Sequence, residues 1–396
     1  MTTRFMKAVL VLACTAQPLF QLMAHGLSSN APLENWLREN RLLVSVQLRC
    51  LDLPIAVDNG PKVLHYIERY LRPGRRETER MLGRAAYYLP IFERELRRRG
   101  LPETLKFLPI VESGLLPGIT SPAGAVGLWQ FMPATARYFE LVMNDRLDER
   151  RDPRRSTAAA ARLLSHLYDE FCDWSLALAA YNCGPGRVRR LLRRTGSRHY
   201  RAIRPYLPGQ TQRYIDKFQA VAYVATYYEA FGLSARPDAN LPTDVVTWQT
   251  NERLSFRAVA ERGGLSQRTI RRLNPAYLLP VAEPGQTVVL PAFAAEQLLA
   301  SFRTDDRPVA AIENPGLSPN RPEKRPVFQM GVMSTLLFTI DRLKTKLRKV
   351  HGIKRDGSAA VTLPQPETPG RQRCPGDPTP TALRQRPAFR FEKLAC

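Results

Sequence analysis

The sequence predicts a mainly α-helical domain, followed by a small βααβ module and a disordered tail. The helical prediction rests on apolar residues repeated at helical intervals, such as Val63, Ile67 and Leu71. The module is indicated by two strand-like apolar runs that flank two short helical patterns between residues 245 and 292. The tail is predicted because residues 303–396 contain 12 Pro, and 18 Lys or Arg against 9 Asp or Glu.

The first residues of the chain indicate export. Two basic residues precede a short apolar run, so residues 1–24 are predicted to be a secretory signal peptide. The tetrapeptide Val-Leu-Ala-Cys that ends at Cys14 resembles a bacterial lipoprotein signal, in which Cys14 would carry the lipid. Cleavage further on, near Ala16 or Ala24, is the alternative. In either case the mature chain is expected to leave the cytoplasm.

The N-terminal helical region is assigned to residues 25–90, and its pattern continues to a predicted C-cap at Gly100. Pro102 suits the first turn of the next helix, which is expected to end near Gly114. A second helical domain is assigned to residues 91–235.

Four residues are expected to begin helices in the second domain. Pro133 and Pro153 suit first-turn positions, and Asp152 and Asp173 suit the N-caps of two helices. The helix after Asp173 is expected to stop at the Gly-Pro-Gly sequence that begins at Gly184, and further helix is expected up to about Phe231.

A linker rich in Pro, Asp and Asn leads to the module, which is assigned to residues 243–293. Within it the patterns predict the strand VVTWQ, the helices SFRAVAERG and SQRTIRRLN, and the strand QTVVLPA. In the basic tail, assigned to residues 303–396, the apolar run 327–340 is too short to span a bilayer. A partly structured tail is favoured there over an interfacial helix.

The net charge of +23 comes mainly from Arg and admits anionic partners of several kinds. Zinc-finger spacing, a helix-turn-helix signature and basic runs interleaved with aromatic residues are all missing from the sequence, so nucleic acid is not an expected partner. The five His residues are scattered, and neither a metal site nor a cofactor is expected.

One acid stands out in the apolar stretch between residues 108 and 136. Glu112 lies among aliphatic residues, Gly and Pro, and the next carboxylate is Glu140. A carboxylate removed from water without a charged partner is costly, so it is either hydrogen-bonded or holds its proton to a raised pH. A general acid needs the second property, which makes Glu112 a candidate catalytic acid.

Three motifs around this acid carry a resemblance to a known family. They are Glu112-Ser113, then Gly127-Leu128-Trp129-Gln130 through Pro133, then Ala180-Tyr181-Asn182. In order and spacing they resemble the catalytic domain of the soluble lytic transglycosylase family. The resemblance implies a lysozyme-like fold of the α+β superfamily. The 243–293 module resembles a LysM module, although Asn251-Glu252-Arg253-Leu254 departs from that pattern.

The resemblance also implies the reaction. Members of the family cleave the β-1,4 bond between N-acetylmuramic acid and N-acetylglucosamine in peptidoglycan and leave a 1,6-anhydromuramic end. Glu112 would protonate the glycosidic oxygen, and the N-acetyl group of the substrate would stabilise the positive centre. The carboxylate of Glu112 would then accept the proton of the muramoyl O6 as that oxygen attacks C1. The implied partner is therefore the glycan strand.

The same resemblance assigns substrate contacts residue by residue. Ser121 matches the serine that hydrogen-bonds the N-acetyl group, and Gln130 and Met132 match residues that line the subsites beside the scissile bond. Tyr181 matches the tyrosine that hydrogen-bonds near the glutamate, and Asn182 matches its neighbour in the cleft.

Tyr214 falls in the later Gln-x-Tyr segment of the family. The other positions have structural alternatives that the sequence leaves open. Ser121 also suits a loop residue, Gln130 a support for the loop backbone, Met132 a core residue, Tyr181 a core residue with a satisfied hydroxyl and Asn182 a helix C-cap.

Two other functions compete with the transglycosylase. A goose-type lysozyme-like muramidase would hydrolyse the same bond and would need a water-activating carboxylate, for which Asp145, Asp148 and Asp152 are candidates. A non-catalytic peptidoglycan-binding envelope protein would keep the fold without turnover. For each function the expected location is the cell envelope, facing the periplasm, with attachment to the outer membrane through Cys14 or to a membrane through the basic tail.

Overall fold

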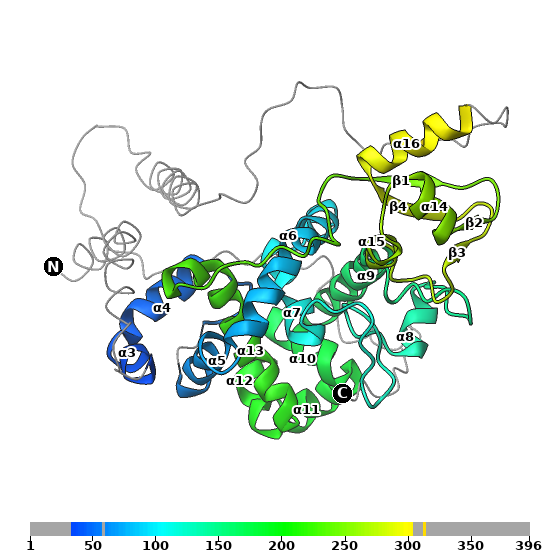
Figure 1. Ribbon diagram of the computed structural model, residues 1–396. Helices are drawn as coiled ribbons and strands as arrows, with labels where there is room; N and C mark the ends of the chain where they lie inside the picture. The colour runs from blue at the N-terminus through cyan, green and yellow to red at the C-terminus, as the bar shows by residue number, and fades with distance from the viewer. Residues whose placement is uncertain (1–32, 58–59, 304–311, 314–396) are drawn as a thin grey trace, which may run out of the picture. The chain divides into compact units, whose positions relative to one another are not determined.

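Helices make up most of the chain that the structure, a computed structural model, describes: residues 33–57, 60–303 and 312–313 (Figure 1). The predicted leader with Cys14, and all of the predicted tail except residues 303 and 312–313, lie outside the described residues. The first helices are α3 (Leu33–Glu39), α4 (Arg41–Cys50), α5 (Pro61–Leu71) and α6 (Arg75–Arg98), followed by the 3-10 helix η1 (Glu103–Phe107), α7 (Leu108–Ser113) and α8 (Pro133–Tyr138).

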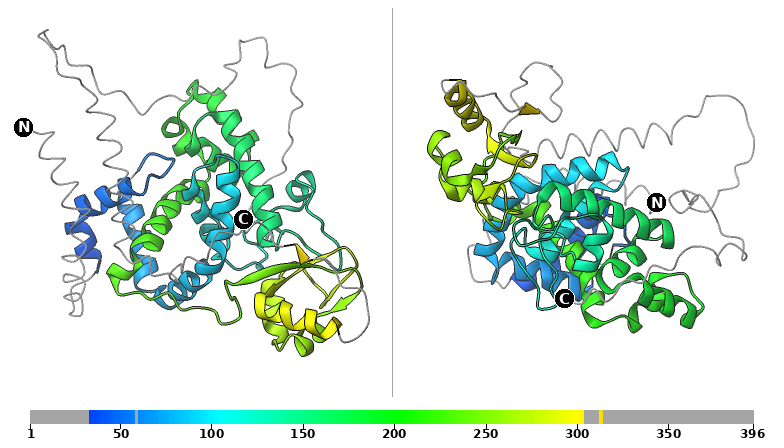
Figure 2. Two further views of the ribbon diagram at one scale, coloured as in Figure 1. Left: turned by 90° about the horizontal axis from the view of Figure 1, so that it is seen from above. Right: turned by 90° about the vertical axis from the view of Figure 1, so that its right-hand side faces the viewer.

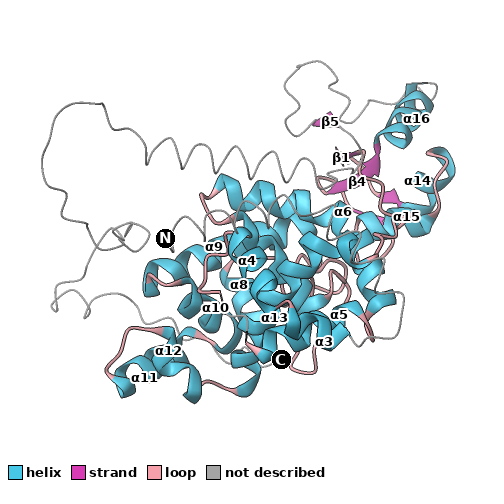
Figure 3. Cartoon of the chain, turned by 90° about the vertical axis from the view of Figure 1, so that its left-hand side faces the viewer, coloured by secondary structure: helices cyan, strands magenta, loops and turns pink. Residues whose placement is uncertain are grey.

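The second half of the helical region contains the elements that flank the candidate site. They are α9 (Pro153–Phe171), α10 (Trp174–Cys183), α11 (Pro185–Thr195), α12 (Tyr200–Ile203), η2 (Arg204–Tyr206), α13 (Gly209–Tyr227) and η3 (Tyr228–Phe231). Figure 3 shows this part as helices joined by loops. Longer loops precede it, between α7 and α8 and between α8 and α9.

The capping residues explain where several helices begin and end. The carboxylate of Asp152 accepts the backbone N–H of Arg154 and of Arg155 at the start of α9, both at 2.8 Å, as the sequence predicts. Asp173 accepts the N–H of Leu176 in the same way at the start of α10. After α6 the chain turns at Gly100, whose φ of +65° favours glycine.

The segment after Pro102 differs from the expected single helix. It forms the 3-10 helix η1 and then the short α7. Pro109 accounts for the division, because it has no N–H to donate to an α-helix that had started near Pro102. As an early residue of a new helix Pro109 costs nothing, so α7 begins afresh at Leu108.

The core of the helical region is rich in aromatic residues. Helix α13 packs against α5, α6 packs against α9, and α9 packs against α10. The largest fully buried side chains include Trp129, Tyr88, Tyr223, Phe92 and Phe218. Trp129 comes from the loop between α7 and α8, and its ring contacts that of Phe92 edge to face at 5.5 Å. Burial of Trp129 thus fixes the loop on the helices.

The module is built on an antiparallel pair of strands. Strand β1 (Val245–Gln249) pairs with β4 (Thr287–Pro291), and β2 (Leu254–Ser255) pairs with β3 (Val281–Ala282). Between β2 and β3 lie α14 (Phe256–Arg262) and α15 (Gln267–Leu273), which are capped by the side chains of Ser255 and Ser266. Figure 2 shows these strands and helices in green to yellow.

The module has a hydrophobic core of its own, which includes Trp248, Phe256, Val259, Ile270 and Leu290. The chain continues into α16 (Ala292–Arg303), where the sequence predicted no element, and β5 (Ile312–Glu313) pairs with β1. No helix of the described residues is both long and apolar enough to cross a membrane.

Candidate active site

The candidate acid lies on the last turn of α7. The helix ends at Gly114, which takes a left-handed φ of +59°. The carbonyl of Gly114 accepts a hydrogen bond at 2.9 Å from the buried side chain of Arg84. Next to Glu112, the hydroxyl of Ser113 lies 2.9 Å from the carbonyl of Pro109 and 3.0 Å from that of Leu128. Ser113 therefore fastens α7 to the α7–α8 loop, and the carboxyl of Glu112 is held on a fixed helix end.

Glu112 is half-buried and receives a hydrogen bond from across the site. The hydroxyl of Tyr214, on α13, donates to its Oε1 at 2.6 Å. Loss of hydration raises the pKa of Glu112 to about 7, and the Tyr214 hydrogen bond and the charge of Lys217 offset part of the rise. The group therefore carries a proton at near-neutral pH and has a donor ready to stabilise its carboxylate form.

Lys217 follows Tyr214 by nearly one helical turn and lies on the same side of α13. It is half-buried, with its ammonium 5.7 Å from the ring centre of Tyr66. No carboxylate of the described residues contributes to the pKa shift of Glu112. The pKa of Glu112 is thus set by loss of hydration, which raises it, and by one hydroxyl and one cation, which lower it.

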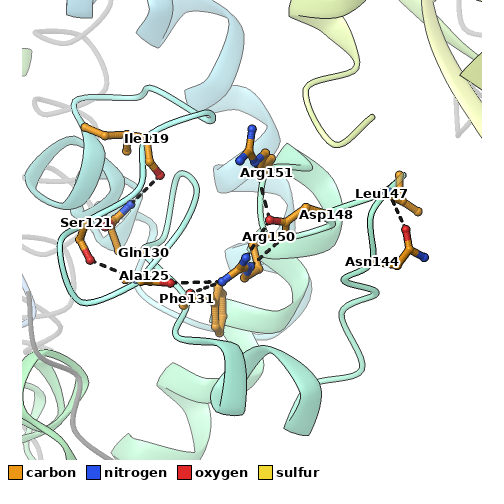
Figure 4. A network of polar contacts seen from close by, with 11 residues as sticks. Ile119, Ser121, Ala125, Gln130, Phe131, Asn144, Leu147, Asp148, Arg150 and Arg151 are labelled. Atoms are coloured by element: carbon orange, nitrogen blue, oxygen red, sulfur yellow. Dashed lines mark hydrogen bonds and ion pairs between the residues drawn. The ribbon is translucent and has the colours of Figure 1, made fainter. Parts of the chain in front are cut away.

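The α7–α8 loop is held together by side chains that the resemblance assigns to substrate (Figure 4). Gln130 is 4% exposed and has a left-handed φ of +50°. Its amide nitrogen donates to the carbonyl of Gly127 at 2.9 Å and lies 3.4 Å from that of Ile119. Ser121 accepts the N–H of Ala125 through its hydroxyl at 3.0 Å. Both side chains thus support the loop backbone.

A charged clamp holds the loop from the other side (Figure 4). Arg150 forms two hydrogen bonds with the buried carboxylate of Asp148, at 2.9 and 2.8 Å, and its guanidinium reaches the carbonyls of Gly124 and Phe131. Gly127 passes so close to this segment that a Cβ there would lie 1.9 Å from the carbonyl of Arg150. Only glycine fits at that position.

Tyr181 and Asn182 end α10 beside this loop. The hydroxyl of Tyr181, which is buried, donates to the carbonyl of Trp129 at 2.7 Å. The side-chain carbonyl of Asn182 accepts the hydroxyl of Thr211, on α13, at 2.9 Å. Trp129 in turn donates through its indole N–H to Thr157. The motif residues therefore join α9, α10, α13 and the loop into one hydrogen-bonded support.

The residues predicted for the site are thus placed in two different ways. The hydroxyl seen to hydrogen-bond Glu112 is that of Tyr214, whereas the bond shown for Tyr181 goes to the loop backbone. Met132 is half-buried at the N-cap of α8. The sequence singled out neither Lys217 nor Arg150. The helical spacing from Tyr214 to Lys217 was a usable signal for the first, whereas nothing in the sequence pairs Arg150 with the loop.

The three carboxylates that could activate water in a hydrolase either have structural roles or are exposed to solvent. Asp148 is bound by Arg150, and Arg151 lies 3.7 Å from the same carboxylate. Asp152 caps α9 with its carboxylate, and burial raises its pKa. Asp145 is exposed in the loop before Asp148. None of the three shifts the pKa of Glu112.

Metal-binding groups do not gather in the described part of the chain, where no three His, Cys, Asp or Glu side chains are close enough together to hold an ion. The residues around Glu112 are a hydroxyl, a cation and hydrogen-bonded loop atoms, which do not form a ligand set for a metal. What the described residues around Glu112 offer is proton transfer at one carboxyl.

The resemblance of the motifs predicts a glycan-cleaving domain around Glu112, and the structure places this acid at a helix end beside a tyrosine donor. In agreement, residues 90–203 match the family described as the transglycosylase SLT domain. The chain therefore contains a transglycosylase SLT domain, which confirms the resemblance seen in the motifs.

Curated relatives extend the similarity beyond this domain. The chain is 27% identical over 326 residues to membrane-bound lytic murein transglycosylase D of Escherichia coli K12, covering 79% of this chain and 71% of that protein. It is 39% identical over 111 residues to the putative tributyltin chloride resistance protein of Alteromonas sp. strain M-1, covering 28% and 54%. The soluble lytic murein transglycosylase of E. coli K12 is 31% identical over 117 residues, covering 28% and 18%.

Among solved structures, the 70-kDa soluble lytic transglycosylase of E. coli matches 55% of this chain at 18% identity and a TM-score of 0.32. The inactive E503Q mutant of the lytic transglycosylase Slt of Pseudomonas aeruginosa matches 56% at 21% identity and a TM-score of 0.32. The chain spans about half the length of the first and 39% of the second.

Proposed function

We propose that the protein is a peptidoglycan lytic transglycosylase that cleaves the β-1,4 bond between N-acetylmuramic acid and N-acetylglucosamine and forms 1,6-anhydromuramic ends. The observation that carries the proposal is the environment of Glu112, a half-buried acid with a pKa raised to about 7 and a hydrogen bond from Tyr214. It occurs within an SLT domain, and relatives bear the name of this activity.

Glu112 acts first as the general acid. Because it holds its proton near neutral pH, it can protonate the glycosidic oxygen as the bond to C1 breaks. The N-acetyl oxygen of the substrate stabilises the positive charge at C1. The new carboxylate of Glu112 is stabilised by the Tyr214 hydroxyl and by the charge of Lys217.

Glu112 then acts as the base. Its carboxylate accepts the proton of the muramoyl O6, and this oxygen forms the bond to C1 that closes the 1,6-anhydro ring. The carboxyl regains its proton, and the enzyme is ready for another turn. Because the nucleophile belongs to the substrate, no second carboxylate is needed, in agreement with the structural roles of Asp148 and Asp152.

The remaining motif residues position the glycan. Ser121 and Gln130 shape the loop beside Glu112, and each keeps a polar group for sugar: the proton of the Ser121 hydroxyl and the side-chain carbonyl of Gln130. Met132 and Asn182 line the glycan at the start of α8 and near the end of α10, and the buried Tyr181 supports the loop through the carbonyl of Trp129. These assignments rest on the resemblance together with the location of each residue.

The deciding experiment is mass spectrometry of the fragments released from purified sacculi. We expect 1,6-anhydromuropeptides from the wild-type protein. Fragments with reducing muramic ends and no anhydro product would instead identify a hydrolase of the goose-type lysozyme kind. Binding to sacculi without any release of fragments would identify a non-catalytic peptidoglycan-binding protein.

The proposed place of action is the cell envelope, facing the periplasm, as the substrate requires. Attachment to the outer membrane would use Cys14 as the lipid site, and we expect labelled palmitate to be incorporated and to be lost in Cys14→Ser. Incorporation that survives this substitution would exclude Cys14. The module 243–293, LysM-like in sequence, would tether the enzyme and raise the effective concentration of glycan at the site.

A further inference from the structure

A shallow cavity of about 360 Å³, largely open to solvent, lies between α11 and the connection from η2 to α13. It is lined by Arg187, Arg190, Leu191, Tyr206, Leu207 and Pro208. Its volume lies within the usual range for ligand pockets, roughly 300–1,000 Å³. The motifs of the catalytic domain assign nothing to it. Figure 3 shows α11 and α12 together beside α10.

Two arginines that line the cavity have no acidic partner among the described residues. The guanidiniums of Arg187 and Arg190 form no ion pair or side-chain hydrogen bond with any residue that the structure describes. On the same helix Arg189 pairs with Glu170 at 2.9 Å, and Arg194 lies over the ring of Tyr206 at 5.5 Å. The two cavity-lining arginines are therefore available to an anion from outside, while their neighbours are occupied.

The cavity belongs to a segment whose two ends meet at the active site. The hydrogen bond from Thr211 to Asn182 closes the base of the segment. Arg187 follows Asn182 by five residues, and Pro208 precedes Tyr214 by six along α13. At a rise of 1.5 Å per residue, the Pro208 side of the cavity is about 9 Å along the helix axis from Tyr214.

Two guanidiniums beside an aromatic ring and an apolar floor suit one kind of ligand, a carboxylate on an aliphatic chain. The muramic acid residues of peptidoglycan carry short acidic peptides on their lactyl groups. Three extended residues span roughly 10 Å, which is similar to the rise along α13 between Pro208 and Tyr214. The ligand chemistry and the reach of the peptide thus agree.

We propose that this cavity binds a carboxylate of the stem peptide, and that Arg187 and Arg190 make the enzyme prefer peptide-bearing glycan over naked glycan. The inference rests on the proposed transglycosylase function, and it names the part of the substrate that lies beyond the sugars. Tyr206, with 55% of its surface exposed, forms the rim against which the peptide lies.

The test compares two substrates and two variants. The substrates are glycan strands with intact stem peptides and the same strands after an amidase has removed the peptides. In the double variant Arg187→Gln/Arg190→Gln, we expect the preference in kcat/KM for peptide-bearing strands to fall about tenfold, since two partly exposed charge-assisted contacts are lost. The matched control Arg193→Gln/Arg198→Gln removes the same charge from exposed positions outside the cavity and keeps the wild-type preference.

Calorimetry of the binding of a free acidic tetrapeptide to the protein tests this inference separately from the proposed function. Wild-type binding that is lost in the Arg187/Arg190 variant supports the cavity even if no anhydro product forms. An equal loss of preference in the control, or an unchanged preference in the double variant, overturns it. A third outcome also overturns it: the wild-type protein binds anionic phospholipid vesicles, and the double variant loses this binding but still binds the peptide. The cavity would then serve a lipid surface.

Discussion

Two carboxylates beside or on helix α13 have opposite kinds of partner. Asp216, on α13, is 2% exposed, and both of its oxygens lie 3.1 Å from a guanidinium nitrogen of Arg204. Glu112 faces the same helix from α7 and receives a hydroxyl from Tyr214 instead of a guanidinium. The guanidinium beside Asp216 stabilises a negative charge in the protein interior. The hydroxyl beside Glu112 leaves that carboxyl able to hold a proton.

Two other buried acids of the described residues follow the example of Asp216. Glu79 has Arg75 and Arg236 within 3.5 Å, and Asp148 has Arg150. The chain has a net charge of +23 and is rich in arginine, so a shortage of arginines does not explain why no described arginine lies beside Glu112. The absence of an arginine among the described neighbours of Glu112 is the feature that a general acid needs, because a guanidinium would lower the pKa.

The largest expected effect is on turnover. Glu112→Gln removes the transferable proton but keeps the size of the side chain, so release of anhydromuropeptides should fall by roughly a hundredfold to ten-thousandfold, as for other general acids. Release is followed by liquid chromatography and mass spectrometry, and binding to sacculi should be retained. Wild-type rates in this variant would show that the acid has been assigned wrongly.

The paired carboxylate should respond in stability instead. Arg204→Met takes the guanidinium from a carboxylate that is 2% exposed, at a cost of about 2 kcal/mol in the free energy of unfolding. Urea denaturation measures this cost. Arg201→Met, an exposed position on the preceding helix, is the control and should cost little. Equal effects of the two substitutions would contradict the distinction between Asp216 and Glu112.

Tyr214→Phe should weaken the acid and slow the reaction. Without the hydroxyl the carboxylate form of Glu112 loses its hydrogen bond, so the pKa rises further and turnover falls by about tenfold. Glu112 works as an acid only while protonated, so wild-type activity should be lost as pH rises through about 7. In the variant this alkaline limb should move to higher pH. A limb that stays in place would show that Tyr214 does not act on Glu112.

Lys217→Met should produce the smallest change, in the same direction. Its charge lowers the pKa of Glu112 less than the Tyr214 hydrogen bond does, so the alkaline limb should move up by less than in Tyr214→Phe. Arg213→Met, on the same helix, is the matched control, because Arg213 does not shift the pKa of Glu112. A shift in the control alone would indicate a general effect of net charge.

Much of the fold follows from local signals in the sequence. Asp152, Asp173, Ser255 and Ser266 are capping residues whose side chains accept the N–H groups that begin their helices, so the starts of those helices can be read from the chain. The division after Pro102 was missed, because the effect of Pro109 depends on where the preceding turn begins.

For the candidate site, the sequence singled out Glu112 and Tyr214 but not the contact between them. Glu112 stands out by its apolar neighbours, a local property. The bond from Tyr214 to Glu112 joins residues 102 positions apart, and only the packing of α13 against α7 brings them together. Likewise, the role of Arg150 depends on the path of the loop at Gly127, which no local pattern reveals.

The hydrogen bond between Asn182 and Thr211 also makes the enzyme suitable for grafting. It fixes both ends of the segment 183–210, so the loop and helices between them can be exchanged as a cassette while Glu112 and Tyr214 keep their positions. A graft has to retain the buried side chains of Val188, Ile203 and Leu207 and the ion pair of Arg204 with Asp216, whereas the exposed arginines between them can vary. A library of such cassettes would alter which cell-wall fragments are released without altering how the glycosidic bond is broken.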